Sequence, residues 1–210
     1  MNDLVVISYQ DARLGTYFES CRDDLQSFLS TESISITTHC NHNGCSKEIL
    51  DAKVDDLDDN YAVVTYTHGN ESTVTDQNEN VLICDSEYHK YNKSVFYSIA
   101  CSNAKLLGSK FVNYGAKLFF GYNEDTYGIQ GDENEIINIF VESENFALKK
   151  ILHGMSEGEI IYKETYDFFT DKIQELKNID KSLAPLLFHN REAVQLYTNT
   201  NGDKKSFPEL

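Results

Sequence analysis

The chain has 210 residues, of which 40% are hydrophobic and 12% aromatic, enough to fill the core of one good-sized domain. Its 18 basic and 34 acidic residues give a formal net charge of −16. A negative field of this size repels nucleic acid phosphates and anionic lipid surfaces, so we expect no nucleic acid and no membrane as partner. The same charge favours a basic partner or substrate.

The N-terminus and the cysteines indicate a cellular compartment. Residues 1–8 have no basic segment and only a short apolar run, which is too short for a signal peptide or a membrane span. The chain holds an odd number of widely spread cysteines: Cys21, Cys40, Cys45, Cys84 and Cys101. We therefore expect a soluble, cytoplasmic protein with reduced thiols in place of a disulfide framework.

The first third of the chain alternates strands with helices. Residues 4–8 form a buried apolar strand, and apolar positions at helical spacing predict an amphipathic helix over 15–30. Residues 33–37 alternate as a second strand, and Ser46 is placed to cap a short helix. This alternation is typical of a parallel sheet covered on both faces.

The rest of the chain gives further elements in order. A polar turn at 76–79 predicts a hairpin over 72–84. The remaining predictions are a helix over 103–113, a strand over 116–122, helices over 134–153 and from 156, a last strand at 193–197, and a loose tail from about 199.

Two apolar runs end abruptly on reactive side chains. The run YAVVTYTHG ends at His68 and Gly69, and the run SVFYSIACS, 33 residues later, ends at Cys101 and Ser102. If the runs are neighbouring parallel strands, His68 and Cys101 emerge together at the carboxyl edge of one sheet, where open α/β folds bind their ligands. We therefore predict a Cys/His nucleophilic site.

The surroundings of these residues suit acyl transfer. A catalytic cysteine must lose its proton to an adjacent imidazole or be favoured by the positive end of a helix dipole, and Cys101 has a helix directly after it. Gly69 permits a sharp turn, and the backbone N–H groups of Gly69 and Cys101 are placed to face a developing oxyanion.

These residues resemble the caspase-like cysteine proteases, particularly the compact bacterial branch with the CHAT domains and the gingipain-like peptidases. The matching segments are an apolar strand ending in His-Gly (63–69), one ending in Cys (95–101), a helix, Gly-Ala and strand (106–121), and an Asn-containing closing strand (186–197). The resemblance implies an α/β fold, a three-layer α/β/α sandwich with a mostly parallel central sheet. It implies one peptidase domain over 1–210, with a catalytic core at 1–130, C-terminal helices and closing strand at 131–198, and the loose tail at 199–210.

The resemblance also implies an activity. His68 would be the general acid/base and Cys101 the nucleophile of an endopeptidase acting on protein substrates through a thioester, with Gly69 and Cys101 as oxyanion hole and with no cofactor. Compact relatives belong to regulated systems, including antiviral defence and signalling, which implies an activating sensor or adaptor protein.

The preferred substrate residue stays open. Arg13, in the segment Arg-Leu-Gly-Thr, resembles the loop arginine that holds an acidic P1 side chain in caspases. Ile99 stands where caspases have a glutamine, which argues against an acidic P1. Other branches place an acidic residue in this pocket, and Asp11 and Asp85 lie in eligible loops.

The sequence is also compatible with two other functions. The same fold serves as a catalytically silent binding module in some proteins, and the run VVISY at residues 5–9 also resembles Toll/interleukin-receptor-like NAD-cleaving domains, whose glutamate has no recognisable position here. The segment 39–45 contains His and Cys residues without the spacing of a zinc site and is interpreted as a loop, so we expect no metal.

Overall fold

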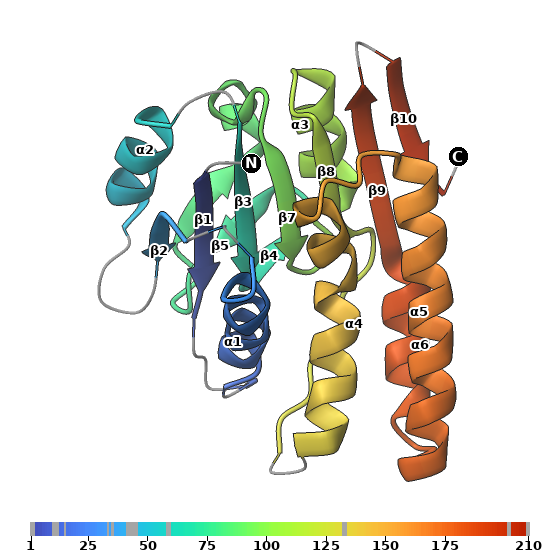
Figure 1. Ribbon diagram of the computed structural model, residues 1–210. Helices are drawn as coiled ribbons and strands as arrows, with labels where there is room; N and C mark the ends of the chain where they lie inside the picture. Colours follow the sequence, from blue (N-terminus) through green and yellow to red (C-terminus); the bar gives the residue numbers. More distant parts are fainter. Residues whose placement is uncertain are drawn as a thin grey trace.

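A seven-stranded sheet forms the centre of the molecule. The computed structural model describes residues 3–9, 13–14, 16–32, 34, 36–40, 46–57, 60–131, 134–200 and 203–208. The strand order is β10-β9-β8-β7-β3-β1-β2, as Figure 1 shows. The strands are β1 (Asp3–Ser8), β2 (Thr38–Cys40), β3 (Tyr61–Tyr66), β7 (Val95–Ile99), β8 (Leu118–Tyr122), β9 (Val194–Thr200) and β10 (Asp203–Phe207). The five strands β2, β1, β3, β7 and β8 are parallel to one another. Strand β9 is antiparallel to β8, and β10 is antiparallel to β9.

Helices cover both faces of this sheet. One face packs against α1 (Tyr17–Leu29), α4 (Asn134–Leu152), α5 (Gly158–Ile179) and α6 (Ala184–Ala193). The other packs against α2 (Lys47–Asp55), the 3-10 turns η1 (Asp85–Tyr91), the π-helical turn η2 (Ala104–Gly108) and α3 (Ser109–Asn113). Because successive strand residues point to opposite faces, the apolar runs supply both cores at once. The predicted three-layer α/β/α sandwich with a mostly parallel sheet is confirmed.

A small second sheet lies on the α2 and α3 side. It consists of β4 (His68–Asn70), β5 (Thr73–Thr75) and β6 (Val81–Cys84), all antiparallel. Its apolar side chains, among them Val74 and Ile83, belong to the core on that face. The hairpin β5–β6 was predicted. Strand β4 was not, because three residues ending on a glycine and an asparagine carry no strand pattern.

The second strand lies later than predicted. It consists of residues 38–40, pairing Val5 with Thr38, in place of 33–37. Two of the five predicted positions, Ser33 and Ser35, lie outside the described residues, while Ile34 and Ile36 are partly buried against the core. The apolar alternation there reflects the anchoring of a connecting segment, a signal that periodicity alone does not separate from a strand.

The C-terminal region differs from the prediction in two ways. The Asn-containing segment expected as a closing strand is mostly helix α6, which Pro185 at its start favours, and only β9 follows it as a strand. The loose tail is wrong for residues 203–207, which form β10 and pair with β9 from Thr200 to Leu196. Phe207 is buried there, so an apolar anchor holds this otherwise polar strand.

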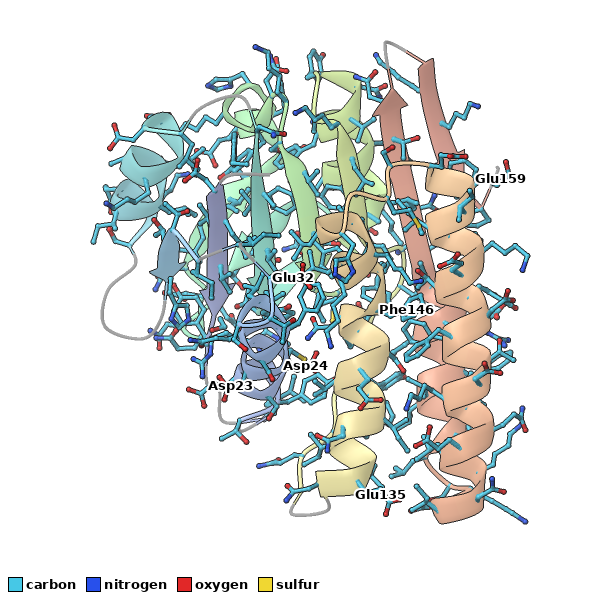
Figure 2. The ribbon with its side chains drawn as sticks, viewed as in Figure 1. Asp23, Asp24, Glu32, Glu135, Phe146 and Glu159 are labelled. Atoms are coloured by element: carbon cyan, nitrogen blue, oxygen red, sulfur yellow. The ribbon has the colours of Figure 1, made fainter. Side chains whose placement is uncertain are left out.

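The acidic residues are spread over the surface. Figure 2 shows Asp23, Glu135 and Glu159 projecting outward from three different helices. No helix in the described part of the chain combines the length and apolarity needed to cross a bilayer.

Candidate active site

The strand register brings His68 and Cys101 opposite each other. Strands β3 and β7 are parallel neighbours, and every paired residue differs in number by 33, from Ala62 with Val95 to Tyr66 with Ile99. Beyond the strands, the N–H of Thr67 still donates to the carbonyl of Ile99, at 3.4 Å. His68 and Cys101 follow these strand ends at the same offset, and both line the same two pockets at the carboxyl edge of the sheet.

Two adjoining pockets contain both residues. A cleft of about 650 Å³ is lined by His68, Cys101, Gly69, Arg13 and Asp125, among others. A smaller inner pocket of about 50 Å³ is lined by His68 and Cys101 and by the buried residues Tyr17 and Glu144. Both reactive side chains are half-buried, so they are accessible from solvent and from the interior pocket.

Helix α1 supports the imidazole. The Phe18 ring meets the His68 ring edge-on, with the centroids 5.4 Å apart. Phe18 is buried because it is one of the apolar positions of α1 that face the sheet. The helix predicted from spacing therefore supplies one wall behind His68.

The turn that carries Cys101 is fixed from two sides. Ser102 has a left-handed backbone, with φ of 57°, and its N–H and Oγ donate to the Glu124 carbonyl and to Asp125 Oδ1, each at 2.9 Å. Below it, Asn103 donates to Ser98 Oγ. The helical run begins at Ala104, close to the Cys101 turn, but it consists of the π-helical turn η2 and the short helix α3 in place of the single helix predicted over 103–113.

Gly69 is required for a reason other than the predicted sharp turn. Its backbone lies outside the left-handed region, but a Cβ there would stand 2.5 Å from the Thr73 carbonyl oxygen and 3.2 Å from Ala100. The glycine therefore permits the close approach of β4 to β5 beside the nucleophile. Its N–H and that of Cys101 remain the predicted oxyanion donors.

Sequence reasoning missed Glu144. It comes from α4, is 1% exposed, and accepts hydrogen bonds from Tyr122 Oη and from Asn190 Nδ2, the latter at 3.0 Å. Burial raises the pKa of its carboxyl to about 7, although both hydrogen bonds act in the opposite direction. A signal existed: Glu144 lies four residues from both Phe140 and Leu148, on the apolar face of the helix.

The predicted substrate-binding residues fall in different places. Arg13 is exposed and lines the larger cleft with His68 and Cys101. Asp85 forms an ion pair with Lys110 at 2.5 Å and lines neither of the two pockets, so it is not available as a P1 partner. Asp11 lies outside the described residues.

Only His39 and Cys40 of the segment with the His and Cys residues are described. His39 and Cys40 belong to β2, His39 Nε2 is 2.9 Å from Ser8 Oγ, and residues 41–45 lie outside the described part. No group of three His, Cys, Asp or Glu side chains suited to a metal occurs among the described residues. Cys40 is in a disulfide, so the expectation of five reduced thiols fails at that position, while Cys21, Cys84 and Cys101 are free.

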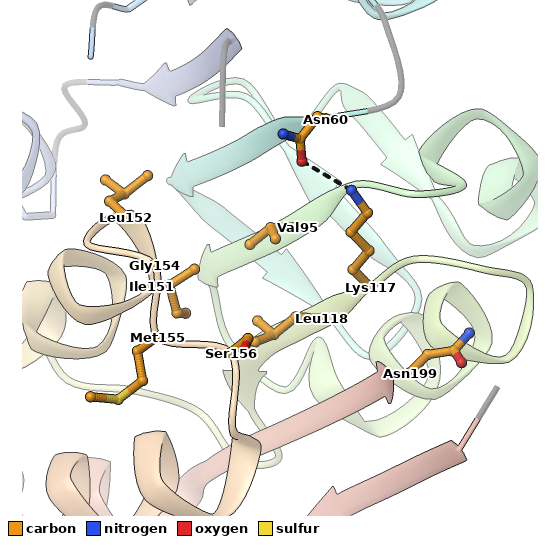
Figure 3. A pocket seen from close by; sticks show the side chains of 10 residues that line it. All are labelled: Asn60, Val95, Lys117, Leu118, Ile151, Leu152, Gly154, Met155, Ser156 and Asn199. Atoms are coloured by element: carbon orange, nitrogen blue, oxygen red, sulfur yellow. Dashed lines mark hydrogen bonds between the residues drawn. The ribbon is translucent and has the colours of Figure 1, made fainter. Parts of the chain in front are cut away.

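A separate pocket of about 470 Å³ opens at the opposite edge of the sheet. Figure 3 shows it between the starting residues of two parallel strands, Val95 and Leu118, and the connection after α4, which includes Met155. Lys117 donates to Asn60 Oδ1 at its rim, at 3.0 Å. Among the described residues no cysteine or histidine lines it, so the candidate active site is the larger cleft around Cys101 together with its adjoining inner pocket.

Comparisons with known proteins bear on the fold. No protein-family model and no curated protein matches the sequence. The complex of the Porphyromonas gingivalis RgpB pro- and mature domains aligns with a TM-score of 0.57 at 10% identity, covering 91% of this chain and 46% of that one. The crystal structure of the Arg-specific cysteine proteinase gingipain R (RgpB) aligns with a TM-score of 0.55 at 11% identity, covering 91% and 45%.

This chain thus spans less than half the length of either protein. A structural match at such low sequence identity is evidence about the fold alone, and it gives no support for the CHAT branch in particular. The chain has the caspase-like fold of gingipain R.

Proposed function

We propose that this protein is a cysteine endopeptidase with Cys101 as nucleophile and His68 as general acid and base. The observation that carries the proposal is the shared register: two adjacent parallel strands end on an imidazole and a thiol that line the same cleft. The fold of the neighbouring cysteine proteinases supports the same reaction class.

The chemistry follows from these groups. His68 takes the proton of the Cys101 thiol, and the sulfur attacks the peptide carbonyl, whose oxygen becomes an oxyanion facing the N–H groups of Gly69 and Cys101. The imidazolium then protonates the departing amine, leaving a thioester. His68 next removes a proton from water, which attacks the thioester, releases the acid and restores the thiol.

The test is hydrolysis of a fluorogenic peptide library by the wild-type chain and by Cys101→Ala and His68→Ala. We expect each variant to lose activity by a factor of roughly a thousand or more while thermal unfolding stays within a few degrees. Cys84→Ala is the matched control, because Cys84 is a free, partly exposed thiol outside the two pockets and should be dispensable.

Two alternatives are separated by the same samples. If no peptide is cleaved and a thiol-reactive peptide probe labels Cys84 as readily as Cys101, the chain is a silent binding module of the same fold. If it consumes NAD, the Toll/interleukin-receptor-like reading replaces the peptidase.

The P1 residue is tested by the library itself. Arg13 at the cleft favours an acidic P1, whereas the negative net charge and the buried Glu144 in the inner pocket favour a basic one, the specificity that the gingipain R name states for that protein. Arg13→Gln should lower cleavage of acidic P1 peptides only. Unchanged cleavage would remove Arg13 from the substrate site.

We further propose that a partner regulates the enzyme, as a sensor or adaptor does in defence and signalling pathways. The inner pocket beside Cys101 measures only about 50 Å³, too narrow for a long side chain without rearrangement. An activator would open it. Adding proteins encoded beside this chain should then raise the hydrolysis rate, and a rate independent of every one of them argues for constitutive activity.

A further inference from the structure

The loop after β8 forms one side of the Cys101 pocket. Thr126, Tyr127 and Gly128 line the inner pocket, and the Thr126 carbonyl and hydroxyl oxygens each lie 4.0 Å from Cys101 Sγ. The loop follows directly from β8 and is not part of the sheet. Backbone bonds hold its start, where Asn123 N–H donates to the Ala193 carbonyl and Ser102 N–H to the Glu124 carbonyl, and side chains hold the residues that reach the pocket.

Asn190 of α6 holds the loop by its backbone. Tyr127 N–H donates to Asn190 Oδ1 at 2.9 Å, and Asn190 Nδ2 donates to the Tyr127 carbonyl at 2.8 Å. One amide side chain thus satisfies both backbone groups of Tyr127, as a strand partner would. The neighbouring His189 adds a third contact, with Nε2 2.8 Å from the Asp125 carbonyl.

Glu144 of α4 fixes the orientation of that amide. Its Oε1 accepts from Asn190 Nδ2 at 3.0 Å, so only one flip state of the amide satisfies both Glu144 and the Tyr127 carbonyl. Tyr122 Oη, from β8, donates to the other carboxyl oxygen. Asn190 and Glu144 are both nearly fully buried, so an unmade bond here leaves a polar group without water.

We infer that Glu144 and Asn190 are positioning residues for the Cys101 pocket, which they shape by clamping the backbone of Tyr127. This inference rests on the proposed function for its catalytic meaning, but the clamp itself is a structural claim. It predicts that breaking the clamp changes the environment of Cys101 while the core stays folded.

The first test measures alkylation rates by mass spectrometry. In Asn190→Leu, which keeps the side-chain size and removes both bonds to Tyr127, we expect iodoacetamide to label Cys101 faster by roughly tenfold, the factor that corresponds to losing about one net buried hydrogen bond. A peptide-based thiol probe should label it more slowly, because the pocket wall is gone.

Two other cysteines serve as internal references. Cys21 is free and 0% exposed, so its labelling reports unfolding, while the partly exposed Cys84 reports the general reactivity of thiols in the sample. Thr165→Val is the matched control, because Thr165 is also fully buried and its hydroxyl bonds only within α5, to the Ile161 carbonyl at 2.6 Å. It should leave both probe rates at Cys101 unchanged.

Hydrogen exchange gives a second readout if Asn190→Leu exposes Cys21. In Glu144→Gln, which preserves one acceptor and the side-chain length, the Tyr127 amide should exchange faster than in the wild type and more slowly than in Glu144→Met, which fills a similar volume without that acceptor. This graded rescue is not expected of a residue that merely fills space.

The inference is overturned if both probes label Cys101 at wild-type rates in a folded Asn190→Leu protein, or if Thr165→Val shifts them equally. These readouts need no peptide hydrolysis. A clamp effect without hydrolysis would refute the peptidase alone, and hydrolysis that survives an intact folded Asn190→Leu unchanged would refute the clamp alone.

Discussion

One carboxyl group determines part of the pH response of this protein. Burial raises the pKa of Glu144 from its ordinary 4.5 to about 7. The titratable groups whose charges interact with this carboxyl are Tyr17, Cys21, Tyr66, Tyr97 and Tyr122. The fold therefore binds a proton that the unfolded chain has released between these two pH values. Its stabilising contribution is complete below about pH 4.5 and is lost as the pH rises through about 7.

Glu144→Gln should remove that dependence. We expect the free energy of unfolding of the wild type, relative to the variant, to fall by on the order of 3 kcal/mol between pH 4.5 and 8. Urea unfolding at a series of pH values measures the difference directly. A difference that stays constant over this range would show that Glu144 titrates normally in the fold.

Gly69 should tolerate no side chain. In Gly69→Ala the new Cβ would meet the Thr73 carbonyl oxygen, which belongs to backbone and has little room to shift. We expect a loss of about 1–3 kcal/mol in unfolding free energy, as in other overpacked sites, together with loss of peptide hydrolysis. Lys177→Ala, at an exposed position of α5 that lines neither pocket, is the control for hydrolysis; full activity in Gly69→Ala would mean that β4 can move without harm to the site.

Among the elements, those with strong periodicity were predictable from sequence. Helices α1, α4 and α5 and strands β1, β3, β7 and β8 carry long apolar patterns, and the offset between His68 and Cys101 was readable because parallel neighbours share a register. Strands β4 and β10 were not predicted, and β2 was predicted at the wrong residues. Each has only three to five residues with few apolar positions, so its structure depends on the strands it pairs with.

The loop that completes the site was unpredictable for a related reason. Residues 123–128 are placed by Asn190 and Ser102, which lie far away in sequence on either side. Nothing local to the loop specifies these bonds. Only Glu144, an acidic residue on the apolar face of α4, indicated from the sequence that a buried polar interaction exists in this region.

Strand β10 should contribute measurably to stability. Phe207 is 7% exposed, and its carbonyl accepts from Gln195 Nε2 at 2.8 Å. Phe207→Ala should cost about 3 kcal/mol, at the lower end for a phenylalanine because the strand is at the sheet edge. Lys205→Ala, at an exposed position of the same strand, should cost much less in the same chemical unfolding experiment. If both substitutions lower the free energy of unfolding by the same negligible amount, these residues behave as the loose tail that the sequence predicts.

For the whole molecule, the net charge of −16 acts against compactness. Like charges spread over the surface repel one another, and salt screens this repulsion within a Debye length of about 10 Å at 0.1 M. Raising NaCl from about 20 to about 300 mM should therefore increase the melting temperature by a few degrees and then level off. A melting temperature that falls with salt would show that the surface ion pairs outweigh the repulsion.

The Tyr127 clamp also has a consequence for how the protein comes into being. A nascent chain emerges N-terminus first, so the imidazole and the thiol leave the ribosome well before the helix that supplies Asn190. Under the proposed function, an unfinished or prematurely terminated polypeptide would contain the reactive pair but not a shaped pocket. Incomplete chains would therefore lack uncontrolled proteolytic activity, because the pocket is shaped only after α6 has docked.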